Sequence, residues 1–233
     1  MHVFRLALVA TAIAAPAHAA EKSFMVTDFS GVSSAGAHKI VVTTGKSPSV
    51  RAVGDREDID RLKIEVNDGT LRIGHKGSGG WLNWRKAEPA TIYVTTHKLS
   101  TAKLAGAGDM VVDRMSGDAV KLSLAGAGDL SVGVVKSESL DVSVAGSGDI
   151  AMTGTCDAAT VSIAGSGNVE AVGLKCQTIS AKVAGSGNIK ADVAKTATLR
   201  IAGSGDIEIH GNAKCDVRTT GSGRVRCGTN DEG

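Results

Sequence analysis

The sequence has few aromatic residues, and this scarcity limits the kind of core that it can build. Aromatic side chains make up 3% of the chain, and none follows Tyr93, whereas glycine is abundant at 30 residues. A helical globular domain needs large side chains and few glycines, so this composition argues against one. The C-terminal part must instead pack a core of Val, Ile, Leu, Ala and Met.

Motifs of the common enzyme classes are also missing. The segment TTGKS (43–47) lacks the first glycine of a phosphate-binding loop, and neither G-x-S-x-G nor H-E-x-x-H occurs. The histidines that follow the N-terminal segment are scattered without ligand spacing, at His38, His75, His97 and His210. The sequence therefore predicts no catalytic residues, no metal site and no cofactor.

The first residues have the layout of a secretory signal. Arg5 is followed by an apolar run over 6–15 and then by Ala17-His18-Ala19, a small-residue cleavage site. We expect residues 1–19 to be removed and the protein to be exported, to the periplasm or surface of a bacterium. The apolar run is too short for a permanent membrane span, no later transmembrane segment is expected, and no Cys for a lipid anchor follows the cleavage site.

The net charge of the chain is close to zero, so the protein as a whole attracts polyanions only weakly. The formal net charge is +2 for the whole chain and falls to about +1 without the signal, which holds one Arg and no acid. Such a balance gives no global attraction to nucleic acid or to an anionic membrane. We therefore expect no nucleic-acid partner.

One five-residue phrase recurs seven times between Ala105 and Arg224. It reads AGAGD twice, then AGSGD, AGSGN twice, AGSGD and finally TGSGR, at intervals of 18 to 20 residues. Apolar residues generally stand one and three positions before each phrase, and five and seven positions after its start, with mostly polar or small residues between them. This period of two is typical of strands that bury one face.

Each repeat is expected to form one coil of a solenoid, made of a strand, a glycine-rich bend, a second strand and a variable corner. A propeller is the alternative, but its blades need about 40 residues and usually carry aromatic signatures. The varying coil length favours an all-β fold, a single-stranded right-handed parallel β-helix. Seven rungs about 4.8 Å apart would form a rod roughly 30 Å tall.

The regular coils are predicted over residues 101–227. Residues 24–100 alternate less regularly but also read as strands, with a hairpin turn at NDGT (67–70). We expect wider N-terminal coils or a capping sheet there. Because no Pro- or Ser-rich linker intervenes, residues 20–233 are predicted to be a single domain.

The repeated phrase is interpreted as a bend rather than as a ligand site. Glycine adopts positive φ without steric cost, so the first glycine of each phrase should turn the chain. The structural bend residues are Gly106, Gly126, Gly146, Gly165, Gly185, Gly203 and Gly221. The Asp or Asn that ends most phrases could bind calcium, as in nonapeptide β-rolls, but this period is about twice too long. We favour capping of local backbone groups by the Asx side chains.

Three segments together resemble a known family. FSGVSSAGAHKIVVTTG (29–45), LKIEVNDGTLRI (62–73) and the serial AGSGDI phrases resemble the family described as putative auto-transporter adhesin, head GIN domain. The resemblance covers nearly the whole chain after the signal. It implies an exported bacterial protein with a right-handed β-helix fold, and it supplies no catalytic residues.

The four cysteines are expected to form two disulfides in an exported protein. Cys156 and Cys176 each stand eight residues before the next phrase, so they should lie on adjacent rungs, within the Cα–Cα range of a disulfide. This predicts Cys156–Cys176 and leaves Cys215–Cys227 to staple the last coil. Four buried free thiols are the alternative, and no C-x-x-C or nearby His supports a metal site.

The segment HKGSGGWLNWRKAEP (75–89) has the most unusual composition. Trp81, Trp84 and Arg85 stand close together after a run of glycines. Exposed tryptophans stack on sugar rings or mark a partner surface, which makes these three residues the candidate ligand-binding site. In the alternative interpretation, the indoles fold back and plug the open end of the apolar rod.

Basic residues gather in the last repeats, where they either bind an anionic polymer or protect an exposed sheet edge, which we favour. They are Lys182, Lys190, Arg200, Arg218, Arg224 and Arg226. Taken together, the sequence predicts a non-enzymatic, structural or adhesive envelope protein. Its expected partner is a polysaccharide or an envelope protein, and oligomers could form through the coil ends. The alternative is a polysaccharide lyase or hydrolase on the same scaffold.

Overall fold

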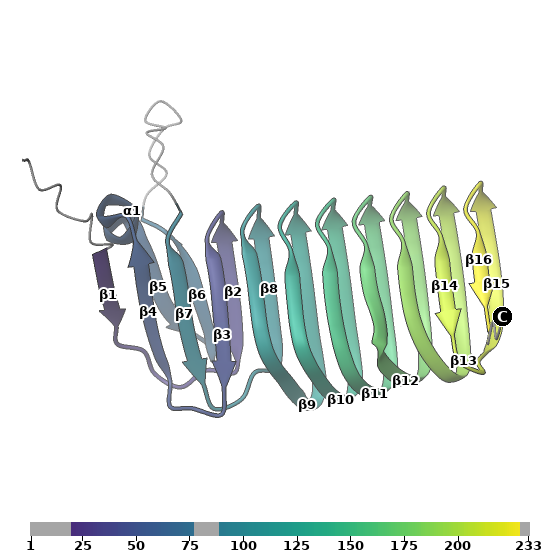
Figure 1. Ribbon diagram of the computed structural model, residues 1–233, viewed down its shortest axis with the longest axis horizontal. Helices are drawn as coiled ribbons and strands as arrows, with labels where there is room; N and C mark the ends of the chain where they lie inside the picture. The colour runs from purple at the N-terminus through teal and green to yellow at the C-terminus, as the bar shows by residue number, and fades with distance from the viewer. Residues whose placement is uncertain (1–19, 77–88, 229–233) are drawn as a thin grey trace, which may run out of the picture.

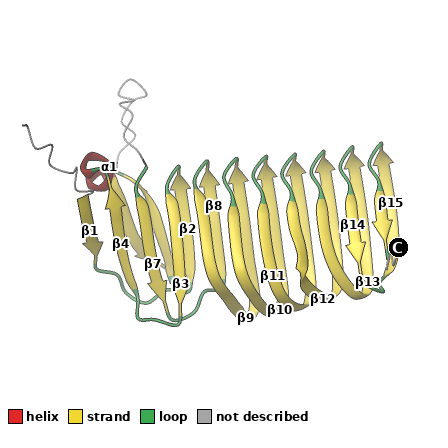
Figure 2. Ribbon diagram, in the orientation of Figure 1, coloured by secondary structure: helices red, strands yellow, loops and turns green. Residues whose placement is uncertain are grey.

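The computed structural model describes residues 20–76 and 89–228. These residues form sixteen strands and one short helix, and the strands join in one sheet that winds along a flattened rod (Figures 1 and 2). The predicted all-β fold, a parallel β-solenoid, is confirmed. The described part of the chain contains no helix with the length and apolar character needed to cross a bilayer.

The regular coils begin at β8 and continue to the C-terminal end of the rod. Their strands are β8 (Thr101–Gly106), β9 (Asp109–Gly126), β10 (Leu130–Gly146), β11 (Ile150–Gly165), β12 (Val169–Gly185), β13 (Ile189–Gly203), β14 (Ile207–His210), β15 (Lys214–Gly221) and β16 (Val225–Cys227). Strands β9 to β13 each run from one bend through the opposite corner to the next bend. The glycine-rich bends therefore line one long edge of the rod, where Figure 2 shows short loops.

Neighbouring coils pair in parallel and in the register that the repeat predicts. Ala145 of β10 lies opposite Ala125 of β9 on one side and Ala164 of β11 on the other, so equivalent residues of each phrase stack directly. The alternating pattern places apolar side chains inside. Each fully buried Leu, Ile or Val contributes about 1.5–3 kcal/mol, so every added coil stabilises the one before it.

Inward-facing residues form a continuous core up to the last coil. Leu122 and Leu124, three and one positions before the second phrase, are fully buried, as are Val142 and Val144 in the next coil. In the last coil the residue equivalent to Leu122, Val217, is 43% exposed, because no further described coil covers it. The alternation of the repeat thus predicts burial correctly except where stacking ends.

The N-terminal part combines coils with antiparallel strands. Its strands are β1 (Ala20–Phe24), β2 (Gly31–Gly36), β3 (Lys39–Thr44), β4 (Ser49–Gly54), β5 (Leu62–Asn67), β6 (Thr70–His75) and β7 (Thr91–Thr96). Strands β2 and β3 form a coil that stacks on β8 and β9, and β6 and β7 stack on its other side. Strand β4 pairs antiparallel with β7, and β1 pairs antiparallel with β4 at the edge of the sheet. Strand β5 pairs antiparallel with β6.

Two details of this end bear on the site. The β5–β6 hairpin turns at Asp68 and Gly69, both with positive φ, where the sequence predicts a turn. The helix α1 (Arg56–Arg61) replaces what the sequence pattern suggested would be strand. Asp55 caps the helix by accepting a hydrogen bond from the Glu57 N–H at 2.7 Å. The acidic residues in the first turn stabilise the helix further, because their negative charge lies at the positive end of the helix dipole.

Candidate functional site

The predicted ligand residues Trp81, Trp84 and Arg85 lie outside the described residues, and so does the predicted signal at 1–19. In the sequence their segment lies between β6 and β7, two strands that Figure 1 shows toward the N-terminal end of the rod. The candidate site is therefore assembled from the described residues around this connection and along the outer faces of the coils.

The bend glycines are required by conformation and by stacking together. All seven have positive φ, between +118° at Gly106 and +136° at Gly203. A Cβ on Gly146 would also lie less than 3.0 Å from the carbonyl oxygen of Gly126 in the neighbouring coil. Gly148 makes the same close approach to Gly128. The constancy of the phrase thus reflects backbone packing.

The Asx residues of the bends form a ladder along the rod. The Asp149 N–H donates to Oδ1 of Asp129 at 3.2 Å, and the Asn168 N–H donates to Oδ1 of Asp149 at 2.8 Å. The Asn168 side-chain amide donates to the same Asp149 oxygen at 2.9 Å. Each side chain therefore caps a backbone N–H of the next coil, whereas the sequence suggested capping of local groups. Asparagine also places a hydrogen-bond donor beside a carboxylate that another Asp would repel.

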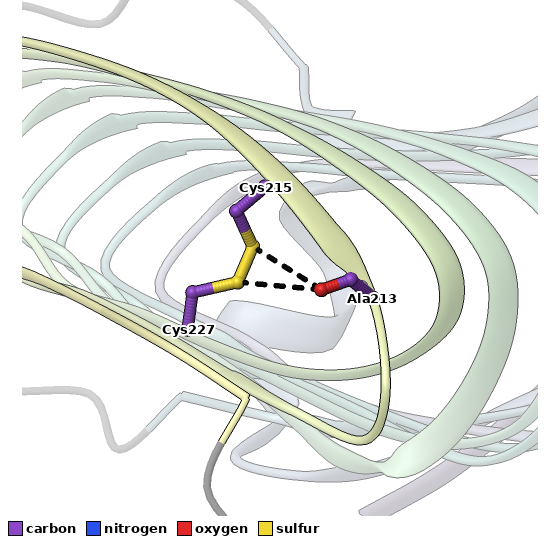
Figure 3. Close-up of a disulfide and its surroundings, with 3 residues drawn as sticks. All are labelled: Ala213, Cys215 and Cys227. Atoms are coloured by element: carbon purple, nitrogen blue, oxygen red, sulfur yellow. Dashed lines mark hydrogen bonds between the residues drawn. A yellow bond between two sulfur atoms is a disulfide. The ribbon is translucent and has the colours of Figure 1, made fainter.

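Two disulfides join the pairs that the repeat frame predicts. Cys156 and Cys176 lie opposite each other on β11 and β12, with their Cα atoms 4.6 Å apart. Cys215 and Cys227 lie in the last coil, with a Cα–Cα distance of 6.5 Å. Figure 3 shows both of these sulfurs near the Ala213 carbonyl oxygen, at 4.0 and 3.7 Å. These are packing contacts, because a disulfide sulfur carries no proton to donate.

The basic residues of the last coils divide between two faces. Lys182, Arg200 and Arg218 lie opposite one another on β12, β13 and β15, in one column of like charge. Lys190 lies on the other face between Glu170 and Glu208, and its Nζ is 3.7 Å from Oε2 of Glu170. One face therefore has a short cationic column, and the other has alternating charges that offset one another.

An exposed tyrosine marks the outer face of strands β3, β4 and β7. Tyr93 is 39% exposed, and the Arg51 guanidinium lies 4.9 Å from its ring centre. Around the ring is a shallow hollow of about 350 Å³, whose polar lining includes Thr43, Ser49 and Thr95. The Ser49 and Thr95 hydroxyls are 2.8 Å apart. An aromatic face beside hydroxyls and a cation is suited to binding a polar ring.

The bend between β2 and β3 departs from the next bend at two positions, the fourth and the fifth, where Lys39 lies opposite Asp109. It reads Ala35-Gly36-Ala37-His38-Lys39, and its Ala35 and Gly36 lie opposite Ala105 and Gly106. His38 thus stands where the next bend has Gly108. A Cβ on Gly108 would collide with the His38 backbone beneath it. On the other side of this coil, β6 ends at His75 and β7 begins only at Thr91, so no bend of the repeated length joins these two strands, and a side chain fits at His38.

The His38 side chain meets two other titratable groups in this space. Its Nε2 lies 3.6 Å from Oδ2 of Asp58 on α1, and Nε2 of His75 at the end of β6 lies 3.4 Å from Oδ1 of Asp58. The two imidazole rings pack edge to face with centroids 4.6 Å apart. The Ala90 N–H donates to Oδ2 of Asp58 at 2.9 Å and fixes that carboxylate. Three elements therefore converge on one cluster.

The protonation of His38 follows from its surroundings. The residue is 3% exposed, and burial lowers the pKa of its ring below 6.5. The Asp58 carboxylate acts against this shift, and the neighbouring His75 adds to it. The ring is therefore neutral at pH 7, with a lone pair on one nitrogen. Among residues 20–76 and 89–228, neither ring nitrogen has a hydrogen-bond partner, since 3.6 Å is too long for one.

The four histidines after residue 19 are scattered in the sequence without ligand spacing, but the structure brings His38 and His75 together. Exposed His97 lies in the β7–β8 connection and His210 at the end of β14, where its Nε2 is 3.6 Å from Oε1 of Glu208. A signal for the cluster was present, because AGAHK (35–39) is a degenerate eighth copy of the phrase with His at a glycine position. Asp58 carried no comparable signal, since the helix that holds it was missed.

Comparison with known proteins agrees with the fold. A model of the family described as "Putative auto-transporter adhesin, head GIN domain" matches residues 28–213. A putative adhesin from Bacteroides fragilis is 21% identical, with a TM-score of 0.81, and the match covers 91% of this chain and 98% of that one. A putative lipid binding protein from Parabacteroides distasonis is 22% identical, with a TM-score of 0.73, covering 92% and 98%. A putative adhesin from Parabacteroides merdae is 20% identical, with a TM-score of 0.70, covering 92% and 97%. No curated protein matches the chain.

Proposed function

The chain belongs to the family described as "Putative auto-transporter adhesin, head GIN domain", and from this membership we propose a non-enzymatic binding protein of the bacterial envelope. Its ligand is an envelope or extracellular polysaccharide, which it holds against the outer face of the solenoid. Residues 20–233 form one domain, which is exported after removal of residues 1–19. The two disulfides support an oxidising compartment, because such bonds persist outside the cytosol.

The observation that carries this proposal is the exposed ring of Tyr93 within its polar hollow. A sugar ring has an apolar face that packs on an aromatic side chain, and hydroxyls at its edge that need hydrogen-bond partners. Tyr93 offers the face, while Thr95 on the same strand and Ser49 on the neighbouring β4 offer hydroxyls. The Arg51 guanidinium lies over the ring and pairs with Glu21 at 3.2 Å, and its other N–H groups can donate to sugar hydroxyls.

The segment that contains Trp81, Trp84 and Arg85 supplies further candidate residues for binding the polysaccharide. Trp81 and Trp84 precede β7, the strand that carries Tyr93, by only a few residues. We propose that they and Arg85 bind further units of the same polymer. A long ligand fits a solenoid because equivalent positions recur along the coils at a constant spacing of about 4.8 Å. Multiple weak contacts along one chain then give useful affinity.

A glycan array probed with the purified chain tests the proposal. We expect binding to a polysaccharide, and Tyr93→Ala should weaken it about 5- to 10-fold, the loss of roughly 1–1.4 kcal/mol of aromatic contact. Val172→Ala is the matched control, because Val172 is also 39% exposed but lies far along the rod on β12. Trp81→Ala and Trp84→Ala should each weaken binding as well.

The same samples separate the alternatives. Release of reducing ends that is lost when an exposed carboxylate is replaced would show a polysaccharide-active enzyme and overturn the non-enzymatic proposal. Absence of glycan binding, together with cross-linking to one envelope protein, would show a protein partner instead. Cell fractionation would place the protein in the periplasm or on the surface.

A further inference from the structure

We propose that His38, Asp58 and His75 form a binding site for a divalent transition-metal ion, with zinc as the best fit. Two imidazoles and one carboxylate, each able to give one ligand atom, lie with these atoms within 4.8 Å of one another. This donor set is typical of zinc sites that keep a fourth position for water. The site lies apart from the Tyr93 hollow, which is lined by other residues.

The distances within the cluster suit a tetrahedral ion. Zinc binds imidazole nitrogen and carboxylate oxygen at about 2.0–2.2 Å, so ligand atoms around it lie roughly 3.4 Å apart. The separations of Asp58 from His38 and His75 are 3.6 and 3.4 Å. Both are too long or at the limit for good hydrogen bonds, and each is close to the edge length of a zinc tetrahedron. They reach different oxygens of Asp58, Oδ2 for His38 and Oδ1 for His75, so coordination through a single oxygen needs small rotations of the carboxylate and of the two imidazoles.

The unpaired state of His38 distinguishes this cluster from an ordinary packed histidine. A buried imidazole normally bonds through at least one nitrogen, because a buried polar group without a partner is costly. Within the described part of the chain, both nitrogens of His38 lack such a partner, although the residue is only 3% exposed. An ion coordinated by one nitrogen would satisfy the ring and offset the cost of burying it.

The surroundings already hold the ligands in place. The Ala90 N–H fixes one oxygen of Asp58, which is the kind of outer contact that orients a ligating carboxylate. His75 is 40% exposed at its side chain, so the cluster opens to solvent on that side, where an ion could enter and a water could complete the tetrahedron. Imidazole ligands disfavour calcium and magnesium, which prefer oxygen donors.

A bound ion would act as a staple at the N-terminal end of the rod. The three ligands come from the β2–β3 bend, from helix α1 and from the end of β6. These elements are separate in sequence, and a single ion would tie the helix and the end of β6 to the first coil. Binding would therefore stabilise the folded chain by mass action.

The test uses the untagged chain after treatment with EDTA and buffer exchange. Isothermal titration with zinc should show one ion per chain, and the melting temperature should rise by about 5–10 °C at a free zinc concentration 100 times Kd. Cobalt should bind at the same stoichiometry and give the visible absorption of a tetrahedral site. Magnesium at the same concentration should shift neither measurement.

Variants decide whether these three residues are the ligands. His75→Ala and Asp58→Asn should weaken zinc binding by about 100-fold or more. The His75 side chain is 40% exposed, and asparagine has the same shape as the largely buried Asp58, so both variants should fold, as circular dichroism would verify. His97→Ala is the control, because His97 is exposed and outside the cluster, and it should bind zinc as the parent chain does. Absence of stoichiometric zinc binding by the parent chain, or equal binding by folded His75→Ala, would overturn the proposal. The outcome is independent of glycan binding.

Discussion

Replacing the bend residue Gly146 with alanine tests why the phrase is repeated. Gly146 has a φ of +128°, and a Cβ there would lie less than 3.0 Å from the carbonyl oxygen of Gly126. That oxygen accepts hydrogen bonds from Ser147 and Gly148, at 2.9 and 3.1 Å. The substitution therefore strains the backbone and also forces apart two coils at the point where they are bonded.

The expected magnitude combines these two effects. Holding alanine in a conformation with positive φ costs about 1–2 kcal/mol. Relieving the collision requires the coils to separate by a sizeable fraction of an ångström at the bend, which weakens two hydrogen bonds worth about 0.5–1.5 kcal/mol each. The packing of the side chains around the bend is disturbed as well. We expect the free energy of unfolding to fall by about 3–5 kcal/mol.

Two other glycines separate the contributions. Gly45 has a φ of +78° but no heavy atom within 4 Å of the position a Cβ would take, so Gly45→Ala should cost only about 1 kcal/mol. Gly148 is not among the residues with positive φ, yet its Cβ would collide with the carbonyl oxygen of Gly128. Gly148→Ala should therefore lose most of the stacking contribution without the conformational one.

Urea denaturation followed by far-UV circular dichroism measures all three variants. We expect the order of destabilisation to be Gly146→Ala, then Gly148→Ala, then Gly45→Ala, with the midpoint shifting and the slope unchanged. If Gly146→Ala costs no more than Gly45→Ala, the phrase is kept for conformation alone. If both are neutral, stacking does not explain the repeat, and a ligand-binding role for the phrase returns.

Two further predictions concern the bend ladder and the disulfides. Asp149→Ala removes the acceptor of two N–H groups of Asn168, so the free energy of unfolding measured in urea should fall by about 1–2 kcal/mol. The control Asp141→Ala breaks only an exposed ion pair and should lower it by about 0.5 kcal/mol or less. Equal losses in the two variants would contradict the ladder. Under mild reduction, alkylation and mass spectrometry should label the half-buried Cys215–Cys227 pair before the buried Cys156–Cys176 pair. Earlier labelling of Cys156 would show that the middle coils open more readily than the last one.

The regular coils could be predicted because their sequence repeats the same physical requirement. The alternation around each phrase identifies strands with one buried face, and the position of Cys156 and Cys176 in the repeat identifies neighbours in space. Both inferences depend on stacking alone, in which residue i contacts its equivalent in the next coil. Where stacking ends, the same rule fails, and inward-facing Val217 becomes exposed.

The N-terminal end could not be predicted to the same depth. Its order in space departs from the order in sequence, since the coil of β2 and β3 lies between β6–β7 and β8–β9. No local pattern reveals such an arrangement, because it depends on strands that are distant in sequence. The short helix α1 was missed for a different reason, since six residues give too little periodicity for a helix to be recognised.

The same steric rule accounts for both the repetition and its exception. In the regular coils, a side chain at the fourth position of the phrase would strike the backbone of the coil beneath, so Gly108 and its equivalents admit no Cβ. Beneath the bend of β2 and β3, residues 20–76 and 89–228 form no such bend, so the position can carry the ring of His38. The imidazole then fills the space that a further coil would occupy. A position freed from stacking can thus hold a chemical group, and for this reason the candidate metal ligands gather at the end of the repeat rather than within it.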